Sequence, residues 1–268
     1  MTPVIVKREG DGVAVVRLNR PESFNSINMD MIDHLNAAIA EVDADRSVRA
    51  VVLTGEGAGF CSGLDLDDGH FAIPGTEDMA EMPRQMLLQV AIASFVEKIH
   101  SSPKPYIAAM NGAAVGGGLA LALGCDIRIA SPKAKFGVVF IKVGANNADL
   151  GISYLLPRII GAGRSAELML SGRIFDAAEA DRIGMLSALV EPDELLSRAI
   201  SFAEGIATSG AFQLWMTKET MWQNLDAPSL RHAILTENRT QIMASMTGDV
   251  EEAFQAFREG RVPVWKAM

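Results

Sequence analysis

The sequence has few cysteines and fewer basic than acidic residues. Its 268 residues include two cysteines, Cys61 and Cys125, whose spacing fits neither a disulfide framework nor a zinc site. We therefore expect no metal site and a reducing, cytoplasmic compartment. The 24 basic residues are outnumbered by 33 acidic residues, which gives a net charge of -9. This acidic balance argues against non-specific binding to nucleic acids or to anionic membranes.

Long apolar runs and targeting segments are also scarce. Residues 1–18, "MTPVIVKREGDGVAVVRL", interrupt their apolar positions with charge, so they predict neither a signal peptide nor a targeting helix. Residues 106–124 are nearly uncharged, but they are rich in Ala and Gly and contain Asn111. A buried strand and a buried helix explain this stretch better than a membrane span. We expect no membrane partner.

Motifs of several large enzyme classes are missing. The chain has no G-x-G-x-x-G followed by an acidic residue and no Gly-Lys-Ser/Thr, which argues against dinucleotide and nucleotide-phosphate sites. H-E-x-x-H and G-x-S-x-G are absent as well. The glycines of this chain therefore need another explanation.

The apolar pattern predicts an α/β core followed by a mainly helical region. Residues 28–45 carry six apolar side chains at helical spacing, with Asn28 or Asp30 available as the N-cap. Short buried strands are expected near residues 48–55 and 105–112, with a helix over 82–101 between them. We expect residues 1–200 to form the core and residues 201–268 a helical C-terminal region.

Two glycine-rich segments follow the buried strands. "NGAAVGGGLALALGCDIRIAS", residues 111–131, places Gly116, Gly117 and Gly118 where a helix begins, although glycine inside a helix costs about 1 kcal/mol relative to alanine. Either the glycines pack closely, or their free N–H groups bind a ligand oxygen that becomes negative during a reaction. "GEGAGFCSGLDL", residues 55–66, takes the corresponding place in the preceding unit, so both loops can face one atom.

Four motifs in order resemble the crotonase, or enoyl-CoA hydratase/isomerase, superfamily: "RPESFNSIN", "GFCSGLDL", "NGAAVGGGLALALGCDIRIA" and "GISYLLPRIIG". The resemblance implies an α/β spiral of repeated strand-strand-helix units that binds an acyl-CoA thioester. It also implies a helical C-terminal region that builds a homotrimer or a dimer of trimers. No separate cofactor is implied, because coenzyme A is part of the substrate.

The resemblance also assigns site residues. The two backbone N–H groups that hold the thioester oxygen map onto Leu64 and Gly117. The path of the adenine and pantetheine groups maps onto Phe24, Ser26, Ser62, Asp65 and Leu66. From the residues alone, Asp65 is equally a cap of the turn that follows it.

The family's hydration chemistry does not carry over. Hydratases of the family have glutamates at the positions of Ala120 and Phe140, and neither residue here can move a proton. Asp149 maps onto the acid of dienoyl-CoA isomerases and onto the nucleophile of chlorobenzoyl-CoA dehalogenases. It is therefore a general acid/base, a nucleophile, or only the N-cap of a helix that starts at Leu150. Isomerase-like chemistry is favoured over a hydratase with an unusual acid/base and over a non-catalytic acyl-CoA-binding protein.

Weaker candidates remain. His70 follows the second glycine loop, and Cys61 fits a buried filler better than a nucleophile. By the resemblance, Arg261 and Lys266 are candidates for contacts with the CoA phosphates. Residues 229–246 carry apolar side chains at near-helical spacing, which suits either a subunit contact or an intramolecular core helix.

Overall fold

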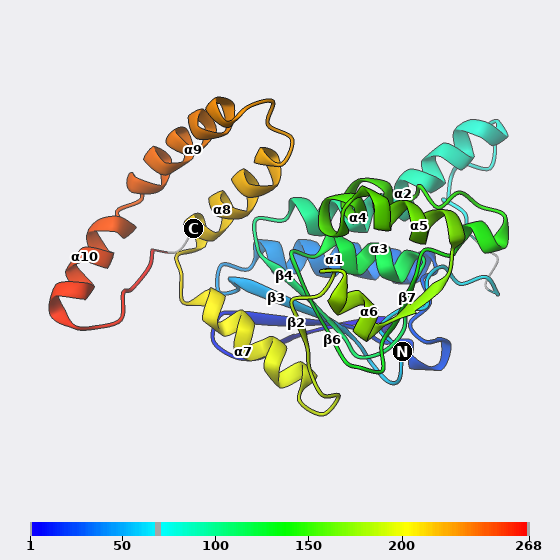
Figure 1. Cartoon of the computed structure of the whole chain (residues 1–268), viewed down its shortest axis with the longest axis horizontal. Helices are drawn as coiled ribbons and strands as arrows, with labels where there is room; N and C mark the ends of the chain where they lie inside the picture. The colour runs from blue at the N-terminus through cyan, green and yellow to red at the C-terminus, as the bar shows by residue number, and fades with distance from the viewer. Residues whose placement is uncertain (1, 68–70, 267–268) are drawn as a thin grey trace.

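The computed structural model describes residues 2–67 and 71–266, which form two β-sheets with surrounding helices (Figure 1). The larger sheet has the strand order β1-β2-β3-β4-β6-β9. Strand β1 is antiparallel to β2, and the other pairs are parallel. Its strands are β1 (Val4–Arg8), β2 (Val13–Leu18), β3 (Ala50–Gly55), β4 (Tyr106–Met110), β6 (Ile127–Ala130) and β9 (Ala188–Leu189).

The smaller sheet supplies the second strand of successive units. Its order is β5-β7-β8, with β5 parallel and β8 antiparallel to β7. In one unit β4 and β5 are followed by a helix, and in the next unit β6 and β7 are followed by helices. This order confirms the expected spiral of strand-strand-helix units. These strands are β5 (Ala114–Val115), β7 (Lys135–Gly137) and β8 (Ile174–Asp176).

Alternation along the strands divides the core between two faces of the larger sheet. Val13 and Val15 pack on one face with α7 (Leu195–Ala207). Ala14 and Val16 pack on the other face with α1 (Met29–Ala44), α2 (Glu81–Ser101) and α3 (Gly117–Gly124). Helix α7 lies on its own side of the sheet in Figure 1, and it buries the evenly spaced Leu195, Ala199 and Ala203.

The expected division between residues 200 and 201 falls inside α7. This helix is continuous over Leu195–Ala207, and its buried side chains on both sides of residue 200 pack on the sheet. The boundary at 200/201 stays a prediction, and the helix that it divides covers the second face of the sheet along its whole length. The sheet-packed part of the chain ends with α7.

Helix α1 (Met29–Ala44) forms as its sequence predicts. The Asn28 side-chain oxygen accepts a hydrogen bond from the Met31 N–H at 2.9 Å, which makes Asn28 the N-cap. All six apolar residues predicted to face inward are buried. These residues are Met31, Ile32, Leu35, Ala38, Ile39 and Val42.

Residues 106–124 form a buried strand and a buried helix. Every residue of β4 and of α3 (Gly117–Gly124) is buried, which explains why this stretch has so few charges. Within residues 2–67 and 71–266, no helix combines the length and the apolar character that crossing a membrane requires.

The other helices surround this core. Helix α2 precedes β4, α4 and α5 lie between β7 and β8 of the smaller sheet, and α6 leads from β8 to β9 of the larger sheet. Their bounds are η1 (Pro21–Ser23), α2 (Glu81–Ser101), η2 (Phe140–Val143), α4 (Ile152–Ile160), α5 (Ala162–Ser171) and α6 (Ala177–Arg182).

Three C-terminal helices extend away from the sheets in Figure 1: α8 (Ala211–Asn224), α9 (Leu230–Ser245) and α10 (Asp249–Glu259). Helix α8 is anchored by Lys218, whose buried ammonium group lies 2.9 Å from the Asp126 carboxylate. Helix α9 buries no residue, so the interpretation of its apolar stripe as an intramolecular core is wrong. Its exposed apolar residues are Leu230, Ile234, Leu235, Ile242 and Met243.

Candidate active site

The three consecutive glycines have three different structural roles. Gly116 adopts φ +54° and ψ -118°, a backbone conformation that side-chain-bearing residues rarely adopt. A Cβ on Gly118 would lie 2.0 Å from the Cys61 carbonyl oxygen, so this glycine allows two segments of backbone to touch. Gly117 is the first residue of α3, where helical N–H groups have no intrahelical partner. Close packing thus explains Gly118, while the Gly117 N–H has no acceptor among the residues that the structure describes.

The second glycine loop lies directly against the first. The Gly63 carbonyl accepts a hydrogen bond from the Ile27 N–H, and the Asp65 N–H donates to the Ile27 carbonyl, both at 2.8 Å. Because neighbouring backbone groups in extended chain point in opposite directions, Leu64 between them presents its N–H away from Ile27. A Cβ placed on Gly63 would lie 3.4 Å from the Gly117 nitrogen.

Two backbone donors are therefore available side by side. In the described part of the chain, neither the Leu64 N–H nor the Gly117 N–H donates a hydrogen bond to a protein acceptor. The positive end of the α3 dipole adds to the field at Gly117. This arrangement has the chemistry of a site that stabilises a developing oxyanion.

Apolar side chains surround the glycine loop. The Phe140 ring comes within 3.5 Å of a Cβ placed on Gly116, and the Leu150 and Ile27 side chains come within 3.4 Å and 3.3 Å of one placed on Gly117. Ala120 is fully buried in α3. The positions that carry glutamates in hydratases of the resembled family therefore contribute only apolar contacts here.

Asp149 lies in the turn beside this apolar wall. Its Oδ1 accepts hydrogen bonds from the Leu150 N–H at 2.7 Å and from the Gln89 side chain at 2.6 Å. Helix α4 begins at Ile152 with Gly151 as its N-cap, so the interpretation of Asp149 as the cap of a helix starting at Leu150 is wrong. Leu150 itself has φ +49°, a strained value for a leucine. Strained backbone of this kind is concentrated at functional sites.

The expected CoA-binding segment is built around Asp65. The Asp65 carboxylate lies 3.0 Å from the Arg20 guanidinium and accepts a hydrogen bond from the Ser26 hydroxyl at 2.9 Å. Its other oxygen accepts a hydrogen bond from the Asp67 N–H at 3.2 Å, so Asp65 does cap the turn that follows it. Asp65 thereby fixes the position of the glycine loop that contains Leu64.

The remaining residues of that segment divide into exposed and backbone-bound groups. Phe24 and Leu66 are exposed to 54% and 71%, which leaves both side chains available for contact with a ligand. The Ser62 N–H donates to the Phe24 carbonyl at 3.0 Å, and its hydroxyl donates to the Ser23 carbonyl at 3.2 Å.

The remaining candidates differ in what the structure shows of them. His70 lies outside the described residues. Burial raises the pKa of the Cys61 thiol to about 12, so this cysteine is an inert filler rather than a nucleophile. The Arg261 guanidinium is paired with Glu252 and Glu259, so its charge is already compensated within the chain. Lys266 is exposed, and its N–H donates to the Asp249 carboxylate at 3.2 Å.

Sequence reasoning overlooked two side chains that shape the site. Arg20 was inside a quoted motif, but its role depends on the distant Asp65, which no local pattern reveals. Gln89 lies 60 residues from Asp149 in the sequence. Nothing in the sequence of α2 distinguishes Gln89 from its other exposed polar residues before the fold brings it to Asp149.

The spiral of strand-strand-helix units is the fold of the crotonase class of proteins. Residues 8–268 match the family model described as Enoyl-CoA hydratase/isomerase, and the chain belongs to this family. It is 40% identical over 266 residues to the probable enoyl-CoA hydratase echA12 of Mycobacterium bovis. The matched region covers 98% of this chain and 92% of that protein.

Two solved structures extend the comparison. A probable enoyl-CoA hydratase/isomerase from Mycobacterium abscessus superimposes with a TM-score of 0.90 at 37% identity, over 98% of each chain. A monofunctional enoyl-CoA isomerase from Mycobacterium smegmatis gives a TM-score of 0.72 at 38% identity, over 87% of this chain and 99% of that one. The protein is thus an enoyl-CoA hydratase/isomerase family enzyme that acts on acyl-CoA, as its sequence predicted.

Proposed function

We propose that the enzyme isomerises an enoyl- or dienoyl-CoA through an enolate whose oxygen accepts hydrogen bonds from the Leu64 and Gly117 N–H groups. The observation that carries the proposal is the pair of amides in adjacent loops that donate to no protein acceptor among the described residues. Asp149 precedes Leu150, whose side chain lies 3.4 Å from a Cβ placed on Gly117. Two preorganised donors favour the charge that appears on the thioester oxygen as a carbon-bound proton leaves.

Asp149 transfers the proton in this scheme. Its Oδ1 is occupied by Leu150 and Gln89, whereas within the described ranges its Oδ2 accepts no hydrogen bond. Oδ2 removes a proton from the α or γ carbon of the substrate, and the electron pair moves onto the thioester oxygen. The same carboxyl group then returns the proton to the other carbon, and the double bond has moved. No water enters this reaction, which agrees with alanine at 120 and phenylalanine at 140.

Hydration is the second candidate function. The relative from Mycobacterium bovis is named a probable enoyl-CoA hydratase, and this relationship favours testing whether the enzyme adds water with an unusual acid/base. A protein that only binds acyl-CoA requires the two amides without Asp149.

Substrate binding follows the exposed face of the two loops. We place the pantetheine and adenine groups against Phe24 and Leu66, with the backbone of Ser26, Ser62 and Asp65 beneath them. Coenzyme A enters as part of the substrate, and no separate cofactor takes part.

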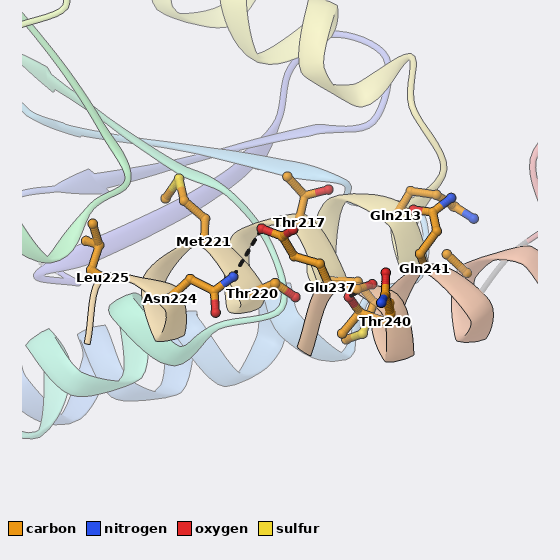
Figure 2. A pocket seen from close by; sticks show the side chains of 12 residues that line it. Gln213, Thr217, Thr220, Met221, Asn224, Leu225, Glu237, Thr240 and Gln241 are labelled. Atoms are coloured by element: carbon orange, nitrogen blue, oxygen red, sulfur yellow. Dashed lines mark hydrogen bonds between the residues drawn. The ribbon is translucent and has the colours of Figure 1, made fainter. Parts of the chain in front are cut away.

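The helical C-terminal region supplies the subunit contacts in this proposal. Helix α9 exposes an apolar stripe, and a cavity of about 730 Å³ lies between α8 and α9 (Figure 2). Figure 2 shows Asn224 of α8 donating a hydrogen bond to Glu237 of α9 across it, at 3.3 Å. A homotrimer or dimer of trimers covers apolar surface that is otherwise exposed to water. Two buried free cysteines suit a cytoplasmic enzyme.

The Asp149→Asn variant tests the proposed chemistry. The asparagine oxygen can keep both hydrogen bonds of Oδ1, while its NH2 group replaces the oxygen that takes the proton. We expect unchanged folding and acyl-CoA affinity, but a loss of at least about 100-fold in isomerisation of a panel of enoyl- and dienoyl-CoA thioesters.

The control is Asp193→Asn, which removes an exposed carboxylate before α7. Isomerisation by Asp149→Asn at the wild-type rate contradicts the proposed role of Asp149. Loss of enoyl absorbance through hydration by the wild type, with no isomer formed, supports the hydratase instead. Tight binding without turnover supports the non-catalytic protein.

A further inference from the structure

The side chain of Gln89 connects helix α2 to the turn that contains Asp149. Gln89 is exposed on α2, and its amide NH2 donates a hydrogen bond of 2.6 Å to Oδ1 of Asp149. We infer that Gln89 is a positioning residue, which orients the Asp149 carboxylate toward the substrate carbon. This inference rests on the proposed function, because it assigns Gln89 a task in the proton transfer by Asp149.

The two donors to Asp149 act on the same oxygen. The Leu150 N–H and the Gln89 NH2 group approach Oδ1 from the backbone and from α2 at 2.7 Å and 2.6 Å. One hydrogen bond still allows the carboxylate to rotate about it, whereas two donors from different elements fix the plane of the group. Hydrogen bonds to an ionised acceptor are among the stronger ones in proteins. Gln89 therefore decides where the second oxygen, Oδ2, points.

Both donors belong to parts of the molecule that are themselves held in place. Helix α2 is fixed in the core by Ile92 and Phe95, which follow Gln89 within two turns. Leu150 is 97% buried, since only 3% of its surface is exposed, and its side chain contacts the position of Gly117. The Asp149 carboxylate is thus held in a fixed position relative to the loop that supplies the oxyanion donor. Proton transfer at a bound carbon requires such a fixed relative position of the acid/base and the oxyanion donor.

The Gln89→Met variant removes the donor and keeps the side-chain length and helix propensity. We expect kcat for enoyl-CoA isomerisation to fall about tenfold, with KM and the thermal midpoint close to wild type. A residue that only supports the fold would lower the midpoint, and one that binds the acyl group would raise KM. The matched control is Gln85→Met, one helical turn earlier on α2 and also exposed.

The Gln89→Glu variant gives a second, independent readout. It keeps the shape of the side chain but places a carboxylate against Oδ1 of Asp149, so kcat falls further than in Gln89→Met at neutral pH. As the pH falls, the pair of carboxyl groups takes up one proton, and the introduced group can donate again. We expect kcat of Gln89→Glu relative to wild type to rise as the pH is lowered.

Asp149→Asn is measured together with the Gln89 variants, so that the acid/base role of Asp149 and the positioning role of Gln89 are tested separately. If Asp149→Asn is inactive while Gln89→Met keeps the wild-type kcat, or changes KM alone, the positioning role of Gln89 is overturned and the proposed function stands. If Asp149→Asn keeps the wild-type rate, both are overturned. A tenfold loss of kcat in Gln89→Met with unchanged KM, together with recovery of Gln89→Glu at low pH, supports the inference.

Discussion

Replacing Gly117 by proline removes one of the two proposed oxyanion donors and puts a ring carbon in the place of its hydrogen. Gly117 is the first residue of α3, which is the helical position that tolerates proline best, because its N–H has no intrahelical acceptor. Proline restricts the residue before it to extended backbone. Gly116 has φ +54° and ψ -118°, the mirror image of an extended conformation, which remains open to it because it has no Cβ.

The steric part of the substitution can be separated from the electrostatic part. A Cβ at position 117 lies 3.3 Å from the Ile27 Cδ1 and 3.4 Å from the Leu150 Cδ1, and both are the far ends of flexible side chains. Gly117→Ala adds this Cβ and keeps the N–H, whereas Gly117→Pro adds it, deletes the N–H and places the ring Cδ where the hydrogen was. The difference between the two variants therefore measures the loss of the donor together with the ring carbon that replaces it.

The expected magnitude follows from the chemistry of the lost hydrogen bond. Removing one oxyanion donor typically costs about 3 kcal/mol of transition-state stabilisation, or roughly 100- to 1000-fold in kcat. We expect Gly117→Ala to stay within about tenfold of the wild type, and Gly117→Pro to fall below Gly117→Ala by about 100-fold or more. Initial rates on enoyl-CoA thioesters give kcat, and calorimetric acyl-CoA affinities and thermal midpoints show whether binding and folding are unchanged. Equal activity of the two variants refutes the reasoning, because the N–H then contributes nothing.

Three further outcomes are expected. Gly118→Ala should lower the free energy of unfolding by about 3 kcal/mol, because its Cβ would lie 2.0 Å from the Cys61 carbonyl oxygen. The control is Gly163→Ala, which has open space around its Cβ and should not lower the free energy of unfolding. Equal urea midpoints of the two variants would contradict this expectation. Arg261 holds the pKa of Glu252 at about 2, below its ordinary 4.5, so the stabilisation is complete above pH 4.5 and is lost as the pH falls through 2. Pepsin cleavage beyond α10 should therefore increase over that interval, and constant resistance would be the contrary result. Light scattering at micromolar concentration should give the mass of a trimer or of two trimers, and a monomer would exclude the proposed subunit contacts.

Much of the core could be predicted because it depends on local pattern. The six buried residues of α1 and its Asn28 cap follow from helical spacing and from the hydrogen-bonding capacity of one side chain. The absence of charge over residues 106–124 indicates burial, and β4 and α3 are buried throughout. The family resemblance added the spiral of repeated strand-strand-helix units, which no single segment specifies.

The roles of the three glycines could be predicted only in part from the sequence. The sequence showed that residues 116–118 need a special backbone, but it left close packing and a free amide as alternatives. The structure assigns packing to Gly118 and leaves the Gly117 N–H without a partner in the described part of the chain. The distinction depends on Cys61, which lies in another turn of the spiral.

By itself, the sequence determined the α/β core and the positions of the two glycine loops, because these depend on residue type and short-range spacing. Its resemblance to the family implied the loss of both hydratase glutamates. Only the tertiary structure decided that Asp149 is no helix cap, that α7 continues through residue 200 to cover the sheet, and that α9 exposes its apolar stripe. These three features depend on contacts, or on missing contacts, between segments that are far apart in the sequence. Gln89 and Asp149 meet for the same reason, since a hydrogen bond across 60 residues is formed by the fold and leaves no local trace in the sequence.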